Sequence, residues 1–345
     1  MSDLTQQDLK TKIKNLDFSS VYLFHGQEEF LKKTYCEMLI SKCVEKDFED
    51  FNFHKLDGKK LSVDELCECV EALPMMADRT CTLVTDFSLD ILSETEFNRI
   101  IDLLTDFPET SVLIFYVNDV FSKTKNERYK KFIKIVEGVG SIVAFEKLGD
   151  IELEKILVSG ASKRKATLSR QTAQYLIRYS GNDLTALQNE LDKLCFYVDG
   201  GEITTDIIDL ISAKSFEATA FDLLKAILAK NADKAFSVIS GLLTQGVKQE
   251  MILGAVISGF NDMYRVKVCE ISGKNPDYLK EIFSSYKGKD FKLKNASRNC
   301  RGLSIEKLRK CIDALNECDL NLKGYSFDPQ IELEQLVIKL ILLIS

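Results

Sequence analysis

Short apolar runs alternate with amphipathic segments along the first 150 residues. Five runs predict strands: VYLF (21–24), FNFHKL (51–56), CTLVTDF (81–87), VLIFYV (112–117) and IVAFEKL (142–148). Helical patterns alternate with them, at 28–44, 62–72, 94–106 and 127–136, and Ser62 to Glu65 has the spacing of a capping box. Strands that are apolar on both faces and alternate with helices predict a parallel sheet inside an α/β domain.

Beyond residue 149 the strand pattern stops and helical periodicity continues. Residues 150–211 hold three helical patterns. The first two lie near 150–166 and 170–179, and the third follows Asn182, which is predicted to cap it. The third pattern carries an apolar stripe of Leu184, Leu187, Leu191 and Leu194. Residues 216–345 predict five or more helices, the last beginning with Asp328 as cap and Pro329 in the first position. We therefore expect an α/β domain at 1–148, a three-helix domain at 149–212 and a helical domain at 213–345.

Composition agrees with folded, helix-rich domains and with a cytoplasmic protein. The chain has 345 residues, is 45% hydrophobic and contains only 4 Pro and 17 Gly. The N-terminal residues lack the apolar core of a signal peptide, and the apolar run near the end is too short for a membrane span and contains Lys339. The ten cysteines show no C-x-x-C spacing and only two histidines accompany them, which predicts buried thiols and no metal site.

Charge is spread unevenly along the chain. Residues 272–310 contain eleven Lys or Arg against four Asp or Glu, a balance of +7, so the rest must sum to −14 to give the formal net charge of −7. Such a basic island can meet a phosphate backbone or an acidic partner, or it can be a solvated helix face. The candidate contacts to DNA or to a partner are Lys287, Lys289, Lys292, Lys294 and Arg298.

The segment VYLFHGQEEFLKKT (21–34) has the layout of a phosphate-binding loop without its residues. A working loop reads G-x-x-x-x-G-K-[ST], because bare backbone N–H groups must surround the phosphates. Counting from Gly26, the second glycine is replaced by Leu31, the lysine is present as Lys32, and the Ser/Thr position holds Lys33. The loop is therefore expected to be degenerate and not to bind nucleotide.

Other parts of an ATPase site are also missing. The predicted strand at 81–87 ends in Asp86 and Phe87, where an Asp-Glu pair would hold Mg²⁺ and orient water. His25 and His54 offer little for nucleophilic catalysis. We expect no catalytic residues and no cofactor, although a divergent ATPase stays open as an alternative.

Four segments together resemble the delta subunit of the bacterial DNA polymerase III clamp loader. They are VYLFHGQEEFL, EALPMMADRTCTLVTDF, SGNDLTALQNELDKL and AFDLLKAILAKNADKAFSVISGLLTQG. The resemblance implies an AAA+/RecA-like N-terminal domain, a three-helix lid, a helical collar and no ATP hydrolysis. A paralogous delta-prime-like subunit is the second alternative, but the zinc module and Ser-Arg-Cys motif usual there are not found.

The resemblance also implies partners and a binding element. Delta subunits bind a ring-shaped sliding clamp and open it, and their collar joins the gamma/tau and delta prime subunits around primer-template DNA. The family's clamp-binding element falls on Leu73, Pro74, Met75 and Met76, with the two methionines as the apolar plug. Pro74 ends the preceding helix and can turn the methionines outward, whereas the alternative interpretation buries them beneath the sheet.

Overall fold

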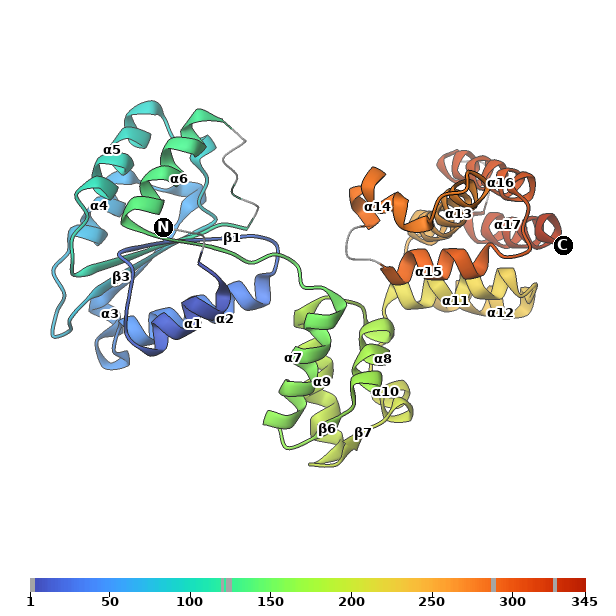
Figure 1. Ribbon diagram of the computed structural model, residues 1–345, viewed down its shortest axis with the longest axis horizontal. Coiled ribbons are helices and arrows are strands. Elements are labelled where there is room, and N and C mark those ends of the chain that lie inside the picture. The colour runs from blue at the N-terminus through green and yellow to red at the C-terminus, as the bar shows by residue number, and fades with distance from the viewer. Residues whose placement is uncertain (1–3, 119–120, 122–125, 287–289, 325–327) are drawn as a thin grey trace. The chain divides into compact units, whose positions relative to one another are not determined.

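The chain forms two compact units, residues 1–148 and 149–345 (Figure 1). The computed structural model describes residues 4–118, 121, 126–286, 290–324 and 328–345. In these ranges no helix is both long and apolar enough to cross a membrane, and no cluster of His, Cys, Asp or Glu could hold a metal ion. All ten cysteines are free, and seven are buried, as their spacing predicted.

The first unit is built on a five-stranded parallel sheet of order β2-β3-β4-β1-β5. The strands are β1 (Val21–His25), β2 (Phe53–Asp57), β3 (Thr80–Thr85), β4 (Ser111–Tyr116) and β5 (Gly140–Ala144). The α-helices are α1 (Gln6–Lys14), α2 (Glu29–Cys43), α3 (Glu49–Asn52), α4 (Val63–Glu71), α5 (Glu94–Thr105) and α6 (Glu127–Val139). The prediction of a parallel sheet inside an α/β domain is confirmed.

Helices cover both faces of this sheet (Figure 1). Alternate residues of β1 show the reason, because Tyr22 and Phe24 pack with α1 and α2 whereas Val21 and Leu23 pack with α4, α5 and α6. All four of these side chains are fully buried. A strand buried on both faces is apolar at every position, and this is the pattern that made it readable in the sequence.

Several predicted boundaries in this unit were wrong. The strand predicted at 51–56 begins only at Phe53, because residues 49–52 form α3. The strand predicted at 142–148 lies at Gly140–Ala144, and α1 was not predicted. Ser62 caps α4 by accepting a hydrogen bond from the Glu65 N–H, which is one half of the predicted capping box.

The second unit begins with α7 (Asp150–Lys163), α8 (Arg170–Ser180), α9 (Leu184–Val198) and α10 (Thr205–Ile211). The four leucines of the predicted stripe on α9 are buried. Three details differ from expectation: α10 is a fourth helix, Asp183 rather than Asn182 caps α9, and the two-residue strands β6 (Thr167–Leu168) and β7 (Glu202–Ile203) pair in parallel. Asp183 is the capping residue because its carboxylate accepts a hydrogen bond from the Ala186 N–H.

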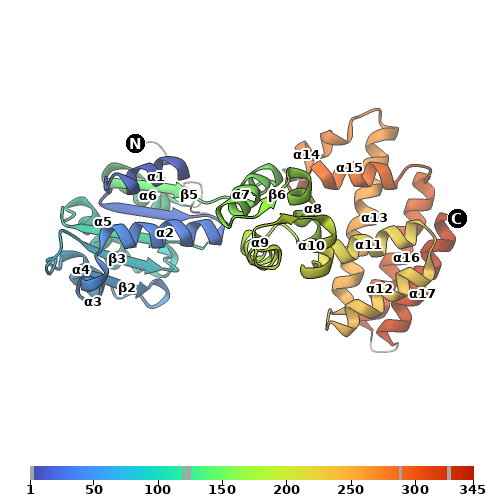
Figure 2. The same ribbon diagram turned by 90° about the horizontal axis from the view of Figure 1, so that it is seen from below.

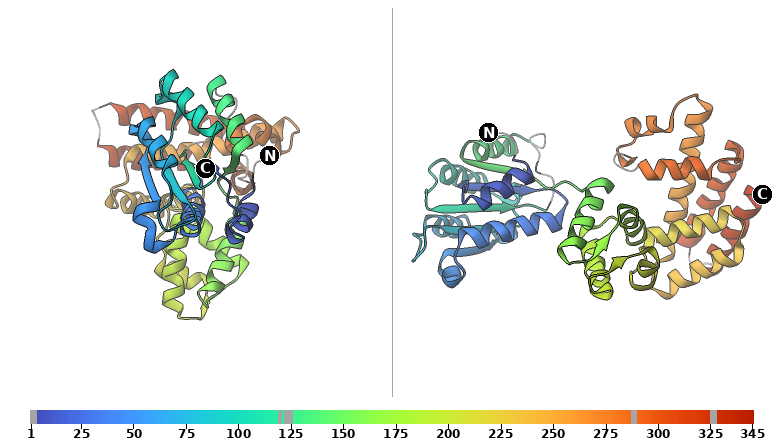
Figure 3. Two further views of the ribbon diagram at one scale, coloured as in Figure 1. Left: turned by 90° about the vertical axis from the view of Figure 1, so that its left-hand side faces the viewer. Right: turned by 60° about the horizontal axis from the view of Figure 1, so that its bottom comes forward.

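The remaining helices pack around one continuous apolar core (Figures 2 and 3). They are α11 (Phe216–Leu228), α12 (Ala232–Thr244), α13 (Gln249–Ile271), α14 (Leu279–Ile282), α15 (Asp290–Asn299), α16 (Ile305–Lys323) and α17 (Pro329–Ile344). Asp328 and Pro329 begin α17 as predicted, and the Asp328 carboxylate accepts from two backbone N–H groups. The all-α prediction is confirmed, whereas a domain boundary at 212 stays a prediction.

Candidate functional site

Gly26 lies at the end of β1, where the phosphate-loop frame begins. Its φ of +113° favours glycine, and a Cβ there would come within 2.3 Å of the Phe145 carbonyl oxygen. That same oxygen accepts a hydrogen bond from the Glu28 N–H at 2.9 Å. Gly26 is therefore required by the close approach of the chain after β5, and a backbone N–H of the loop already has a protein partner.

Lys32 is fully buried. Its ammonium donates to the Gly26 carbonyl at 2.9 Å and to the Val117 carbonyl at 2.7 Å, which follow β1 and β4. It also pairs with the Glu29 carboxylate at 2.6 Å. A lysine ammonium has three donors, and these three oxygens satisfy it within the protein.

Glu29 supplies a negative charge where such a loop would hold a phosphate. It lies in the first turn of α2, where the helix dipole favours an anion. One carboxylate oxygen pairs with Lys32, and the other accepts from the Tyr116 hydroxyl at 2.8 Å. Burial and this hydrogen bond raise the pKa of Tyr116, so its hydroxyl stays a donor. Of the other loop positions, Leu31 packs against the core and the Lys33 side chain is 73% exposed.

The neighbouring strand end is also internally paired. Asp86 follows β3 and forms an ion pair with Lys59 at 2.8 Å, and it accepts a hydrogen bond from Asn118. Phe87, at the position of the missing glutamate, is 2% exposed and packs against Phe115 with ring centroids 4.3 Å apart. The carboxyl edge of the sheet is thus occupied by contacts within the protein.

The predicted clamp-binding element lies at the opposite edge, immediately before β3. α4 ends at Glu71, and residues 72–79 form a turn that presents three large apolar side chains to solvent. Leu73 is 85% exposed, Met75 55% and Met76 77%. The interpretation that buries the methionines beneath the sheet is therefore wrong.

This turn, which we call the methionine turn (residues 72–79), is attached at three points to the edge of the sheet. Before it, the Ser111 hydroxyl donates to the Val70 carbonyl. Inside it, the side-chain amide of Asn52 bonds the backbone of Met75. After it, the Thr80 N–H donates to the Thr110 carbonyl at 2.9 Å. The exposed side chains therefore project from an ordered base.

Asn52 is a functional candidate that sequence reasoning missed. It was placed inside a predicted strand, although it is a polar residue between Phe51 and Phe53. The structure places it at the end of α3, fully buried. A lone amide inside an apolar run was the available signal, because a buried amide requires hydrogen-bond partners.

The basic island divides into engaged and exposed side chains. Lys292 forms an ion pair with the buried carboxylate of Asp262 at 3.0 Å and donates to Ser258 at 3.1 Å. Lys294 and Arg298 are exposed on α15. Lys287 and Lys289 lie outside the described residues. Lys292 is therefore engaged by Asp262, although its side chain is still 42% exposed.

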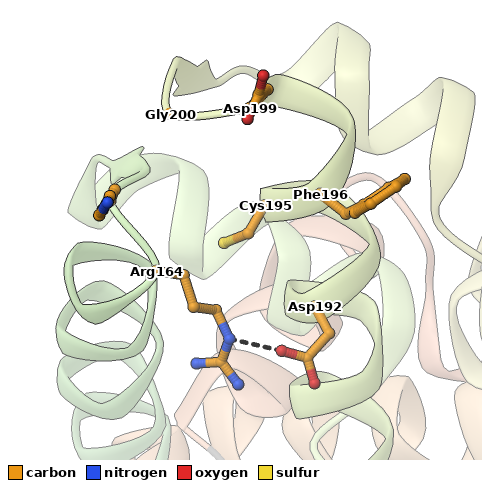
Figure 4. Close-up of a pocket in the computed structure, with 7 residues that line it drawn as sticks. Arg164, Asp192, Cys195, Phe196, Asp199 and Gly200 are labelled. Atoms are coloured by element: carbon orange, nitrogen blue, oxygen red, sulfur yellow. Dashed lines mark hydrogen bonds and ion pairs between the residues drawn. The ribbon is translucent and has the colours of Figure 1, made fainter.

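A hollow lies at the end of α9 (Figure 4). Arg164 points toward Asp192 and forms an ion pair with it, while Phe196 points away and is 89% exposed. The Arg164 guanidinium also donates to the Gly160 carbonyl at 3.1 Å. Its charge is therefore paired with that of Asp192, whereas Lys165, which also lines the hollow, is exposed.

Two family models match the chain. The model described as "DNA polymerase III, delta subunit" matches residues 22–139, and that described as "DNA polymerase III delta subunit, C-terminal domain" matches residues 217–340. Together they cover more than two thirds of the chain, including the methionine turn and most of the helical region.

Individual relatives agree with these matches. The chain is 23% identical over 339 residues to DNA polymerase III subunit delta of Bacillus subtilis, covering 97% of this chain and 96% of the relative. It is 23% identical over 313 residues to the probable subunit delta of Aquifex aeolicus, covering 86% of each. The solved structure of the Bacillus subtilis DNA clamp loader delta protein has the same fold, with a TM-score of 0.64, 21% identity and coverage of 97% and 99%. The chain therefore belongs to the family of DNA polymerase III delta subunits.

Proposed function

We propose that this delta subunit binds the sliding clamp through the methionine turn and opens the ring for loading onto primed DNA. The observation that carries the proposal is the exposure of Leu73, Met75 and Met76 on a turn attached to an ordered sheet edge. Exposed apolar side chains beside charged residues such as Asp78 have the composition of a binding anchor. The ring opens if the turn binds the open form of the clamp interface more tightly than the closed form, because a ligand shifts an equilibrium only by its differential affinity for the two states.

The test is clamp binding by the full chain carrying Met75→Ala and Met76→Ala. Truncating an anchor costs about 2 kcal/mol or more, which is roughly thirtyfold in affinity. The melting temperature should hardly change, because these side chains are exposed. Ile91→Ala is the matched control, since Ile91 is 53% exposed and follows the other end of β3. Unchanged clamp affinity in the double variant would contradict the proposal.

We propose further that the subunit does not hydrolyse ATP. Lys32 already holds two carbonyl oxygens and Glu29, and Asp86 holds Lys59. A phosphate entering this frame would have to displace Glu29 and meet its charge. The expectation is that Mg-ATP leaves the melting temperature of the isolated chain unchanged, and a dissociation constant in the micromolar range by calorimetry would contradict it.

The helical region from 213 to 345 is proposed as the collar that joins the other clamp-loader subunits, gamma/tau and delta prime. The support is a set of apolar side chains left exposed around a complete core: Leu320, Ile331, Ile338 and Leu342. The exposed Lys294 and Arg298 are proposed to contact primer-template DNA in the assembled loader.

A further inference from the structure

The side chain of Asn52 forms two hydrogen bonds with the backbone of Met75 in the methionine turn. Its Oδ1 accepts a hydrogen bond from the Met75 N–H at 2.7 Å, and its Nδ2 donates to the Met75 carbonyl at 2.9 Å. The same Nδ2 donates to the Phe48 carbonyl at 3.0 Å, which ties the amide back to its own helix. The amide is fully buried and uses one acceptor and two donors, so its orientation is fixed by its partners.

These bonds are the ones that hold the middle of the turn. Among the described residues, the structure shows no backbone-to-backbone hydrogen bond for residues 73–79. Asn52 therefore does for Met75 what a neighbouring strand would do, because it pairs with both the N–H and the carbonyl of one residue. The exposed side chains of the turn gain a fixed base from a residue 23 positions earlier in the chain.

The turn also contains a conformation that needs such support. Met76 has a φ of +52°, in the left-handed region that side chains other than glycine rarely adopt. A free peptide of this sequence would leave that conformation for most of the time. Strained backbone persists where the surroundings over-determine it, and the bonds to Met75 stand next to the strained residue.

We infer that Asn52 is a positioning residue that pre-orders the methionine turn for clamp binding. The inference rests on the proposed function, since it assigns Asn52 a role in the same interaction. When only a fraction of molecules holds the binding-competent conformation, the apparent affinity falls by that fraction. Loss of the Asn52 bonds should therefore slow association with the clamp, while the contacts made after binding, and the dissociation rate, change less.

The experiment measures association and dissociation of the sliding clamp from the same organism on the full chain. Asn52→Ala should weaken the affinity about tenfold, equivalent to about 1.4 kcal/mol, mainly through the association rate. Asn52→Asp keeps the acceptor for the Met75 N–H but places an acidic oxygen against the Met75 and Phe48 carbonyls in a fully buried site, so it should weaken binding at least as much as Asn52→Ala. Combined with Met76→Ala, the Asn52→Ala loss should be less than additive, because part of what is positioned is then absent.

Lys32→Met separates positioning from general destabilisation. It removes buried hydrogen bonds from the same unit but lies at the opposite edge of the sheet, so it should lower the melting temperature and leave clamp affinity unchanged. Hydrogen exchange at the Met75 amide gives an independent readout, and it should accelerate in Asn52→Ala.

The possible failures are distinguishable. If Met75→Ala with Met76→Ala does not weaken binding, the proposed function itself fails. If that variant weakens binding but Asn52→Ala leaves the association rate unchanged, or its loss adds fully to that of Met76→Ala, only the positioning role is overturned. Should Asn52→Ala not fold, Asn52→Ser, which places no charge in the buried site, decides, and an association rate equal to that of the unsubstituted chain would overturn the inference.

Discussion

Lys32→Met tests whether the lysine of the phosphate-loop frame stabilises the folded first unit. The methionine keeps most of the length and apolar stem of the side chain but removes all three donors. The Gly26 and Val117 carbonyls lose the bonds at 2.9 and 2.7 Å that they receive from it, and Glu29 loses its buried partner. In a nucleotide-binding enzyme the same change would remove a phosphate contact and spare the fold, so the two roles predict opposite results.

The expected loss of stability is about 3 kcal/mol. Leaving a buried acceptor without its donor costs roughly 1–3 kcal/mol, and two carbonyls are affected. Part of this is offset because the desolvated ammonium disappears as well. For a unit of this size, 1 kcal/mol corresponds to about 2–4 °C, so the melting temperature should fall by about 6–12 °C.

The assay is differential scanning calorimetry, with hydrogen exchange of β1 and β4 to locate the change, because the chain contains no tryptophan. Lys33→Met is the matched control, since the adjacent Lys33 side chain is 73% exposed and should contribute within about 0.5 kcal/mol. The reasoning would be refuted if Lys32→Met melted like the unsubstituted chain. It would also be refuted if Mg-ATP stabilised the unsubstituted chain but not the variant.

Three further predictions concern the helical region. Lys294→Glu with Arg298→Glu should lower the DNA affinity of the assembled loader and reduce the salt slope by about 1.8, as measured by titration at several salt concentrations. Ile338→Glu with Leu342→Glu should abolish co-purification with the other loader subunits, because these side chains are 47% and 70% exposed. Burial and the Asp262 hydrogen bond raise the pKa of Tyr286 from 10.0 to about 12. Unfolding between pH 10 and 12 therefore releases a proton, and the free energy of unfolding should fall as the pH rises through this range. Tyr286→Phe should reduce this pH dependence in a series of denaturation experiments.

Each of these has its own control. Lys234→Glu reverses an exposed charge outside the basic island and should leave the salt slope unchanged. Retained co-purification of the Ile338 and Leu342 variant would remove α17 from the assembly surface. Equal pH dependence in Tyr286→Phe and the unsubstituted chain would assign the alkaline loss to other groups, such as the Cys318 thiol, whose pKa burial raises to about 12.

The fold was predictable where one physical pattern decided the outcome. Strands such as β1 and β4 are buried on both faces, so each appears in the sequence as a continuous apolar run that predicts a strand. The predicted boundaries were wrong where a local hydrogen bond competed with the pattern: Asn52 ends α3 and bonds the backbone of Met75, and Asp183 caps α9 in place of Asn182. The hydrophobic periodicity of the sequence cannot predict such hydrogen bonds, because each one joins a single polar side chain to a backbone group.

The proposed clamp-binding element was predictable only in part. Pro74 and the two methionines stood out as an apolar group after a helix end, and their exposure follows from the turn. What could not be read was the support beneath them. Asn52 lies 23 residues away in sequence from Met75, and the parallel pairing of β2 with β3, which sets Phe53 opposite Cys81, brings them together.

The two edges of the sheet explain why the degenerate loop can be retained. A strand-turn-helix unit leaves carbonyls at the ends of strands and N–H groups at the start of a helix, and each buried group needs a partner. In a nucleotide-binding protein, phosphate and Mg²⁺ supply part of that partnership. Here Lys32 donates to two of these carbonyls, and the Phe145 carbonyl accepts from the Glu28 N–H, so Gly26 and Lys32 are constrained by packing and hydrogen bonding. A lysine that bonds the residues following β1 and β4 joins the ends of two neighbouring strands, and this role requires no nucleotide.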